Sequence, residues 1–192
     1  MASARLKDHR NLVLIGMPGA GKSTVGVLLA KAMSRSFIDT DVYIQAQEGR
    51  RLQDIIDTEG VDFFQDIEAR YVLSLACRGH VIATGGSVVY SAAAMRHLKK
   101  SGLIVYMSLP MRPLVKRLTN LDSRGVVMAP GQTIPNLFEE RQPLYRRYAD
   151  VTVKCVGLTH EQTVARIMAA VGVSDATKRP RGHARTEARY RR

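Results

Sequence analysis

The most informative segment of this chain reads Gly16-Met17-Pro18-Gly19-Ala20-Gly21-Lys22-Ser23. The segment matches the pattern G-x-x-x-x-G-K-[ST] in full. It follows a short apolar run at residues 11–15, which we predict to be a buried strand. It precedes residues 22–33, whose apolar positions recur at helical spacing. A strand, a glycine-rich turn and a helix in this order predict a loop that binds phosphate.

Each residue type in this loop suits a nucleoside triphosphate. The glycines let the backbone curl so that several N–H groups point at one anion, and the helix start adds partial positive charge. Lys22 can reach the β- and γ-phosphates, and the Ser23 hydroxyl can ligate Mg²⁺. A plain tight turn is the alternative, but it does not explain a lysine after the last glycine. The residues expected to bind the nucleotide here are Gly16, Gly19, Ala20, Gly21, Lys22, Ser23 and Thr24.

Strand-like and helical segments alternate along the rest of the chain. The apolar runs predict strands at residues 11–15, 37–39, 81–83, 103–107 and 151–153. Helical spacing predicts helices at residues 22–33, 52–57, 63–77, 92–100, 110–118, 134–148 and 160–171, with Thr159 as the N-cap of the last. This alternation predicts an α/β fold in which helices cover both faces of a parallel sheet.

Acidic residues and glycines follow two of the predicted strands. Asp39 and Asp41 come at the end of the second strand, and Gly85 and Gly86 follow the third. The carboxyl ends of parallel strands are where open α/β folds bind ligands. One carboxylate can orient or deprotonate a hydroxyl and the other can hold Mg²⁺ through water, although a helix-capping pair is an equal alternative. The glycines can offer backbone N–H groups to a ligand, or form only a turn.

Length and composition favour one globular domain. The chain has 192 residues, of which 45% are apolar and 24% charged. The sequence contains no apolar run long enough to span a membrane and no apolar stretch near its start, so we expect neither a membrane helix nor a secretory signal. Cys77 and Cys155 lack metal-site spacing, and a reducing cytoplasm is the simplest setting.

Positive charge is concentrated at the end of the chain. The formal net charge is +12, and residues 178–192 contain seven Lys/Arg and one Glu. We therefore predict a basic disordered tail at residues 173–192, either solvated or in nonspecific contact with nucleic acid. An alternative function is a nucleotide-dependent RNA-binding or regulatory module that uses this tail. Against it, the chain has no Trp, and Tyr190 is the only aromatic residue of the tail.

Taken together, these motifs resemble those of the shikimate kinases, small P-loop kinases. The matching pieces lie within residues 10–171, in the family's order, and read GMPGAGKST, FIDTD, FFQDIE, ATGGS, KRLTNLDSRG and ERQPLYRRYAD. The resemblance implies a three-layer P-loop kinase domain at residues 1–172, with a five-stranded parallel sheet and a mobile lid at about 119–132. It also implies ATP and Mg²⁺ as cosubstrates, phosphorylation of the 3-hydroxyl of shikimate, and a monomer in the cytoplasm.

The resemblance assigns roles to individual residues. On the acceptor side, Asp41 would hold the hydroxyls and act as base or orienter, Gly85 and Gly86 would contact the acceptor, and Arg141 would clamp its carboxylate. On the nucleotide side, Asp39 would lie near the metal and Arg117 against the adenine. The lid residue Arg124 would reach the transferring phosphate. Lys22, Asp41 and Arg124 would be the catalytic residues.

Three departures from the family pattern touch the acceptor or the lid. Gln65 stands where the family's F-R-x-x-E motif has an arginine, so this substrate-binding position can hydrogen-bond a carboxylate but cannot neutralise it. Ser87 replaces the family's third glycine. The lid reads RGVV at residues 124–127 instead of R-P-L-L. Homoserine, with its ammonium on Asp41 or Asp66, and gluconate-like sugar acids are therefore alternative acceptors.

Overall fold

Five parallel strands form the centre of the protein, which we describe from a computed structural model covering residues 6, 9–118, 127–128 and 131–173. The strands are β1 (Asn11–Ile15), β2 (Phe37–Asp39), β3 (Val81–Ala83), β4 (Gly102–Ser108) and β5 (Val151–Lys154). Their spatial order is β2-β3-β1-β4-β5, and every neighbouring pair is parallel. This confirms the predicted sheet and places β1, which leads into the glycine-rich loop, in the middle.

The central strand is apolar because both of its faces are covered. All five residues of β1 are buried, and residues 12–15 have no exposed surface at all. Strand β1 pairs with β3 on one side and with β4 on the other. A strand in this position buries both faces of its pleat, so a continuous apolar run is expected instead of an alternating one.

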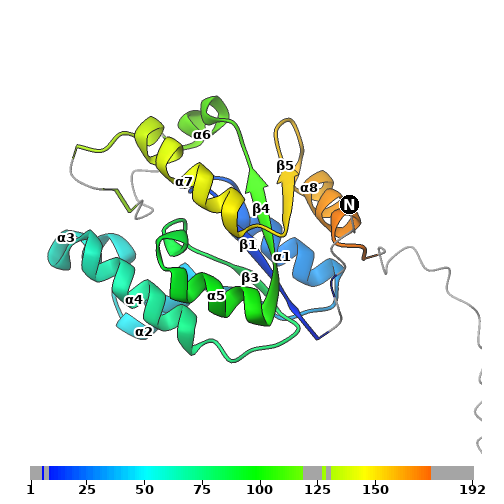
Figure 1. The fold of residues 1–192 in the computed structure, drawn as a ribbon, viewed down its shortest axis with the longest axis horizontal. Coiled ribbons are helices and arrows are strands. Elements are labelled where there is room, and N and C mark those ends of the chain that lie inside the picture. The colour runs from blue at the N-terminus through cyan, green and yellow to red at the C-terminus, as the bar shows by residue number, and fades with distance from the viewer. Residues whose placement is uncertain (1–5, 7–8, 119–126, 129–130, 174–192) are drawn as a thin grey trace, which may run out of the picture.

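Helices form the two outer layers. They are α1 (Lys22–Ala32), α2 (Thr40–Glu48), α3 (Leu52–Glu59), α4 (Val61–Ser74), α5 (Ala92–Ser101), α6 (Met111–Leu118), α7 (Ile134–Tyr148) and α8 (His160–Ala170), with a 3₁₀ turn at Val88–Tyr90. Figure 1 shows α1 and α8 on one side of the sheet and α4, α5 and α7 on the other. The three-layer arrangement is therefore confirmed. None of the described helices is long and apolar enough to cross a membrane.

Helix α2 is the main element that the sequence did not predict. It begins directly after β2, where the Asp39 carboxylate accepts hydrogen bonds from the backbone N–H groups of Asp41 and Val42. Only Thr40 and Ile44 of this helix are buried, so its apolar periodicity is weak. Most other differences are at the ends of helices and strands: α4, for example, covers 61–74 instead of the predicted 63–77, and β4 covers 102–108 instead of 103–107.

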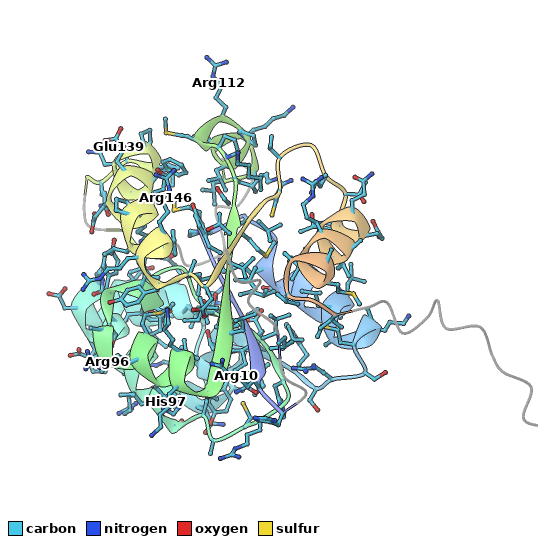
Figure 2. The ribbon with its side chains drawn as sticks, turned by 45° about the vertical axis from the view of Figure 1, so that its right-hand side comes forward. Arg10, Arg96, His97, Arg112, Glu139 and Arg146 are labelled. Atoms are coloured by element: carbon cyan, nitrogen blue, oxygen red, sulfur yellow. The ribbon has the colours of Figure 1, made fainter. Side chains whose placement is uncertain are left out.

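Contacts between neighbouring segments fix the amino-terminal edge of the sheet. Arg10 donates hydrogen bonds to the backbone carbonyls of Lys99 and Gly102, where α5 meets β4. Figure 2 shows Arg10 at the opposite end of the molecule from Arg112 on α6.

The predicted N-cap Thr159 is confirmed, and it forms a capping box with Gln162. Of the predicted tail and lid, residues 174–192, 119–126 and 129–130 lie outside the described part of the chain.

Candidate active site

A cavity of about 710 Å³ lies at the carboxyl edge of the sheet. Segments that are far apart in the sequence contribute to it, because parallel strands bring their carboxyl ends to one edge. Its lining residues are Pro18, Gly19, Gly21, Lys22, Ser23, Thr24, Asp41, Leu52, Phe64, Thr84, Gly85, Gly86, Ser87, Pro113, Lys116, Arg117, Leu118, Val127, Arg141 and His160. The glycine-rich loop and the acidic strand end therefore share one cavity, as the sequence analysis expects.

The glycine-rich loop has a backbone that needs its glycines. Gly16, Gly19 and Gly21 all have positive φ angles, of 146°, 75° and 90°. A Cβ at Gly16 would lie 2.8 Å from the carbonyl oxygen of Met107, so a side chain would also collide there. Helix α1 starts at Gly21 without a side-chain cap. Its first N–H groups are therefore open to an anion in the cavity.

Lys22 lies under this loop and is only 8% exposed. Its ammonium donates to the carbonyl oxygens of Gly16 at 2.7 Å and Met17 at 3.0 Å. Burial lowers the pKa of Lys22 to about 8, against the opposing effect of the charges of Asp41 and Asp39. A buried ammonium that is held mainly by neutral carbonyls favours an anionic ligand, because a phosphate would stabilise its charge.

Asp39 and Asp41 play different parts. Asp39 caps α2 through its Oδ1 atom and does not line the cavity, so the helix-capping alternative holds for this residue. Asp41 lines the cavity. Burial, and then the charge of Asp39, raise the pKa of Asp41 to about 6, while Lys22 lowers it. Asp41 is therefore ionised at neutral pH and can accept a hydrogen bond from a hydroxyl.

Gly85 and Gly86 allow a close approach between the loop and the acceptor side. In this structure the N–H of Gly85 donates to the Thr40 hydroxyl at 2.9 Å. A Cβ on Gly86 would lie 2.9 Å from Pro18 and 3.1 Å from Nη1 of Arg141. The absence of side chains at this pair therefore brings the glycine-rich loop, α4 and α7 together.

Arg141 on α7 provides a buried positive charge and is 1% exposed. Its Nε donates to the Tyr90 hydroxyl at 3.0 Å and its Nη2 donates to the carbonyl oxygen of Val127 at 2.6 Å. Among the described residues, its Nη1 has no hydrogen-bond partner. A buried guanidinium with an unused N–H on a cavity wall is suited to a carboxylate or phosphate ligand.

Glu68 on α4 does not line the cavity but lies against the cavity-lining Gly85, and the sequence analysis gave it no role. It is 1% exposed, and its Oε2 accepts a hydrogen bond from the Ser87 hydroxyl at 2.6 Å. Its Oε1 has no partner among the described residues. One sequence signal could have found it, because Glu68 lies four residues after the buried Phe64, on the apolar face of the helix.

Of the remaining predicted residues, Arg117 lines the cavity and Gln65 does not. Gln65 is half-buried on α4 but does not line the cavity, unlike its neighbour Phe64. Arg117 lines the cavity and donates to the carbonyl oxygen of Gly19 at 3.2 Å. His160 also lines the cavity, beside Gly21, and had no predicted role. Arg124 lies outside the described residues.

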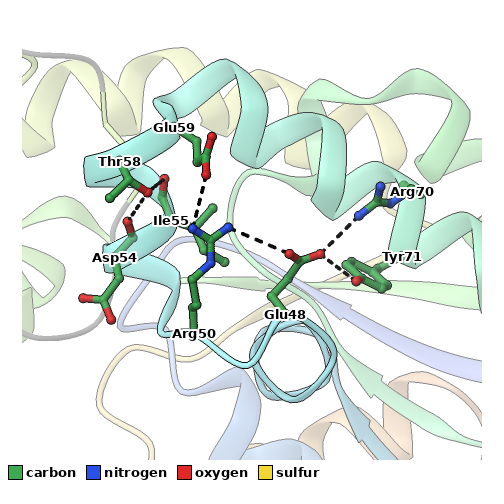
Figure 3. A network of polar contacts seen from close by, with 8 residues as sticks. All are labelled: Glu48, Arg50, Asp54, Ile55, Thr58, Glu59, Arg70 and Tyr71. Carbon is green, nitrogen blue, oxygen red and sulfur yellow. Dashed lines mark hydrogen bonds and ion pairs between the residues drawn. The ribbon is translucent and has the colours of Figure 1, made fainter.

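Helices α2, α3 and α4 form the acceptor-side wall and have an apolar cluster of their own, which consists of Ile44, Leu52, Ile55, Phe64, Ile67 and Val127. A polar network reinforces it (Figure 3). Glu48 at the end of α2 accepts from Arg70 at 3.1 Å and from the Tyr71 hydroxyl at 2.6 Å, and forms an ion pair with Arg50 at 4.0 Å. Arg50 also donates to Glu59 of α3 at 3.2 Å, so the network ties the three helices together.

Comparisons with known proteins show which family the chain belongs to. The sequence profile described as shikimate kinase matches residues 18–172. The chain belongs to the shikimate kinase family. A shikimate kinase of Rhizobium meliloti is 36% identical over 170 residues, which cover 87% of this chain and 88% of the relative. A shikimate kinase of Thiobacillus denitrificans is 38% identical over 163 residues, covering 83% and 87%.

Solved shikimate kinases share the fold. The structure of the Acinetobacter baumannii shikimate kinase in complex with shikimate matches with a TM-score of 0.79 and 30% identity, over 85% of this chain and 93% of that one. The shikimate kinase of Aquifex aeolicus matches with a TM-score of 0.72 and 30% identity, over 84% and 96%. The predicted P-loop kinase fold and ATP-dependent kinase activity are thereby confirmed for this member of the shikimate kinase family.

Proposed function

We propose that this protein transfers the γ-phosphoryl group of ATP to the 3-hydroxyl of shikimate. The observation that carries the proposal is the buried Arg141, which lines the cavity shared with the phosphate loop and whose Nη1 has no hydrogen-bond partner among the described residues. A shikimate carboxylate on this guanidinium would orient the ring within reach of Asp41. Family membership and the shikimate-bound relative support the same substrate.

We propose that Asp41 is the group that orients the reacting hydroxyl. It is ionised at neutral pH, lines the cavity and lies close enough to Lys22 to affect its pKa. Orienting the hydroxyl near the γ-phosphate contributes directly to catalysis, because phosphoryl transfer is catalysed mainly by positioning and charge stabilisation. Gly85 and Gly86 would form the floor of the acceptor site.

At the nucleotide end, Lys22 and the first N–H groups of α1 would bind the phosphates. The donor set also fits Mg²⁺, because the Ser23 hydroxyl lines the cavity and the Asp39 carboxylate lies near Lys22. Mg²⁺ neutralises phosphate charge when bound. Arg117 and the predicted lid residue Arg124 would contact the adenine and the transferring phosphate. A cytoplasmic monomer with a nonspecific basic tail stays our prediction for the whole protein.

The test of the proposed function is a coupled ADP-release assay with shikimate, homoserine, gluconate and nucleoside monophosphates as acceptors. We expect shikimate to give the highest kcat/KM, because Arg141 matches a carboxylate and the Asp41 carboxylate, which also lines the cavity, can accept a hydrogen bond from a hydroxyl. A tenfold or greater preference for another acceptor, about 1.4 kcal/mol, would overturn the substrate assignment and leave the kinase assignment intact.

A further inference from the structure

The buried carboxyl group of Glu68 has no part in the mechanism described so far. Its Oε2 accepts from the Ser87 hydroxyl at 2.6 Å, which is the only hydrogen bond that the Glu68 side chain makes with the described residues. Its Oε1 is left without a partner. An ionised carboxylate with one oxygen buried and unpaired is strongly unfavourable, so the location of a proton on this group matters.

Gly85 brings this carboxyl group together with that of Asp41. A Cβ at Gly85 would collide with Oε1 of Glu68 and would lie 2.7 Å from Oδ1 of Asp41. The two oxygens therefore meet over the same side of one glycine, where Asp41 enters the cavity. Two neighbouring carboxyl groups in such a place do not both ionise, because like charges repel at low dielectric.

The surroundings decide which of the two keeps its proton. Burial, and then the charge of Asp41 on α2, raise the pKa of Glu68 to about 8, whereas Ser87, Arg141 on α7 and Lys22 at the start of α1 lower it. In the described part of the chain, neither cation forms an ion pair with Glu68. Glu68, whose Oε1 is buried without a partner among the described residues, is therefore the group that keeps a proton at neutral pH.

We propose that Ser87 is a positioning residue for the acceptor: by donating to Oε2 of Glu68 it keeps the carboxyl proton on Oε1, which faces Asp41 and the acceptor hydroxyl across Gly85. Glu68 then donates a hydrogen bond at this point, and Asp41 is free to accept one from the reacting hydroxyl. No bond is made or broken by this pair. The inference rests on the proposed function and adds to it the residue that orients the second acid of the site.

The test compares Ser87→Ala, which removes the hydroxyl, with Ser87→Thr, which keeps it. In the full-length enzyme, we expect Ser87→Ala to raise the KM for shikimate about tenfold while the KM for ATP changes less than about twofold. Ser87→Thr, which keeps the hydroxyl, should have a shikimate KM close to that of the original enzyme. The matched control is Ser74→Ala, which removes an exposed serine of α4 that donates to the carbonyl oxygen of Tyr71. An unchanged shikimate KM in Ser87→Ala, or no rescue by Ser87→Thr, would overturn the proposal.

A pH profile gives a second readout that a merely structural serine would not affect. In the unmodified enzyme, the KM for shikimate should rise as Glu68 loses its proton near pH 8. Glu68→Gln places a permanent N–H donor on the same side chain, so its shikimate KM should show no such rise. A shikimate KM that is flat between about pH 6 and pH 9 in the unmodified enzyme contradicts the proposal even if Ser87→Ala fails to fold. Absence of any shikimate turnover would instead refute the proposed function.

Discussion

Lys22 shows how one buried side chain can prepare a site for its ligand. Its ammonium already lies between two loop carbonyls, and burial has lowered its pKa to about 8. Because a phosphate would compensate this buried charge better than carbonyls do, the residue is placed to act when ATP arrives. The same burial explains why a neutral replacement should be tolerated by the fold but not by the reaction.

We expect Lys22→Ala to reduce turnover to less than about a tenth of the original rate, since charge stabilisation of this kind contributes several kcal/mol to phosphoryl transfer. The rate is measured by coupled ADP release, and folding by circular dichroism. Lys31→Ala, which removes an exposed lysine from the last turn of the same helix, is the control. Turnover above that level in Lys22→Ala would remove the lysine from the mechanism.

Arg141→Lys should separate acceptor binding from nucleotide binding. Lysine keeps the charge but cannot reproduce the fixed hydrogen bonds to Tyr90 and Val127 while also binding a carboxylate. We expect the shikimate KM to rise roughly 30-fold or more, corresponding to at least about 2 kcal/mol, with little change in the ATP KM. Arg147→Lys on the exposed side of α7 is the matched control. Equal rises for both substrates would contradict a role confined to the acceptor.

Glu68 should also make stability depend on pH. Its pKa is raised from 4.5 to about 8 in the folded protein, so the unfolded chain loses this proton at lower pH than the native state does. The contribution of Glu68 is therefore fully present below about pH 4.5 and is lost as pH rises through about 8.

Glu68→Gln, which cannot ionise, should consequently gain stability relative to the original protein as pH rises from 5 to 8. Urea unfolding at several pH values measures the difference between the two proteins. A difference that stays constant across this range would show that the carboxyl group ionises alike in the folded and unfolded states.

At the scale of elements, the sequence predicts the strands best. The runs at residues 11–15 and 81–83 have the predicted bounds, because turns or glycines border them and burial of every residue keeps them apolar. Helix α2 was missed because its start depends on the Asp39 cap and only two of its residues are buried. For Glu68, the local pattern indicates only a burial position four residues after Phe64, while its hydrogen bond to Ser87, 19 residues away, leaves no signal in the sequence.

Loss of Glu48 from the polar network should weaken the whole acceptor-side wall, which α2, α3 and α4 form. Glu48→Ala removes the partner of Arg70 and Tyr71 and an ion pair with Arg50 (Figure 3). We expect the Tm to fall by roughly 2–5 °C and the shikimate KM to rise more than the ATP KM. Differential scanning fluorimetry and steady-state kinetics measure the two effects. Asp54→Ala, which breaks only the exposed pair with Arg51, should change neither, and a matching loss there would contradict the special position of Glu48.

For the whole molecule, the residues that line the cavity lie between positions 18 and 160, inside the matched region 18–172. A chain truncated after residue 173 should therefore keep its kcat and both KM values within about twofold. It should lose any salt-dependent binding to nucleic acid, because such binding follows the number of positive charges. A kinetic defect in the truncated enzyme would assign the basic tail to catalysis.

The strand order β2-β3-β1-β4-β5 places acceptor-side residues on one side of the middle strand β1 and nucleotide-side residues on the other. Asp41 and residues 84–87 follow the strands on one flank, whereas Arg117 and His160 follow those on the other. Arg141, from α7, is the exception that crosses over. Apart from Arg141, the residues that select the alcohol can therefore change within one stretch, about 39–87, while the residues that bind ATP stay the same. The divergence of this chain at positions 65 and 87, beside an intact phosphate loop, follows that division.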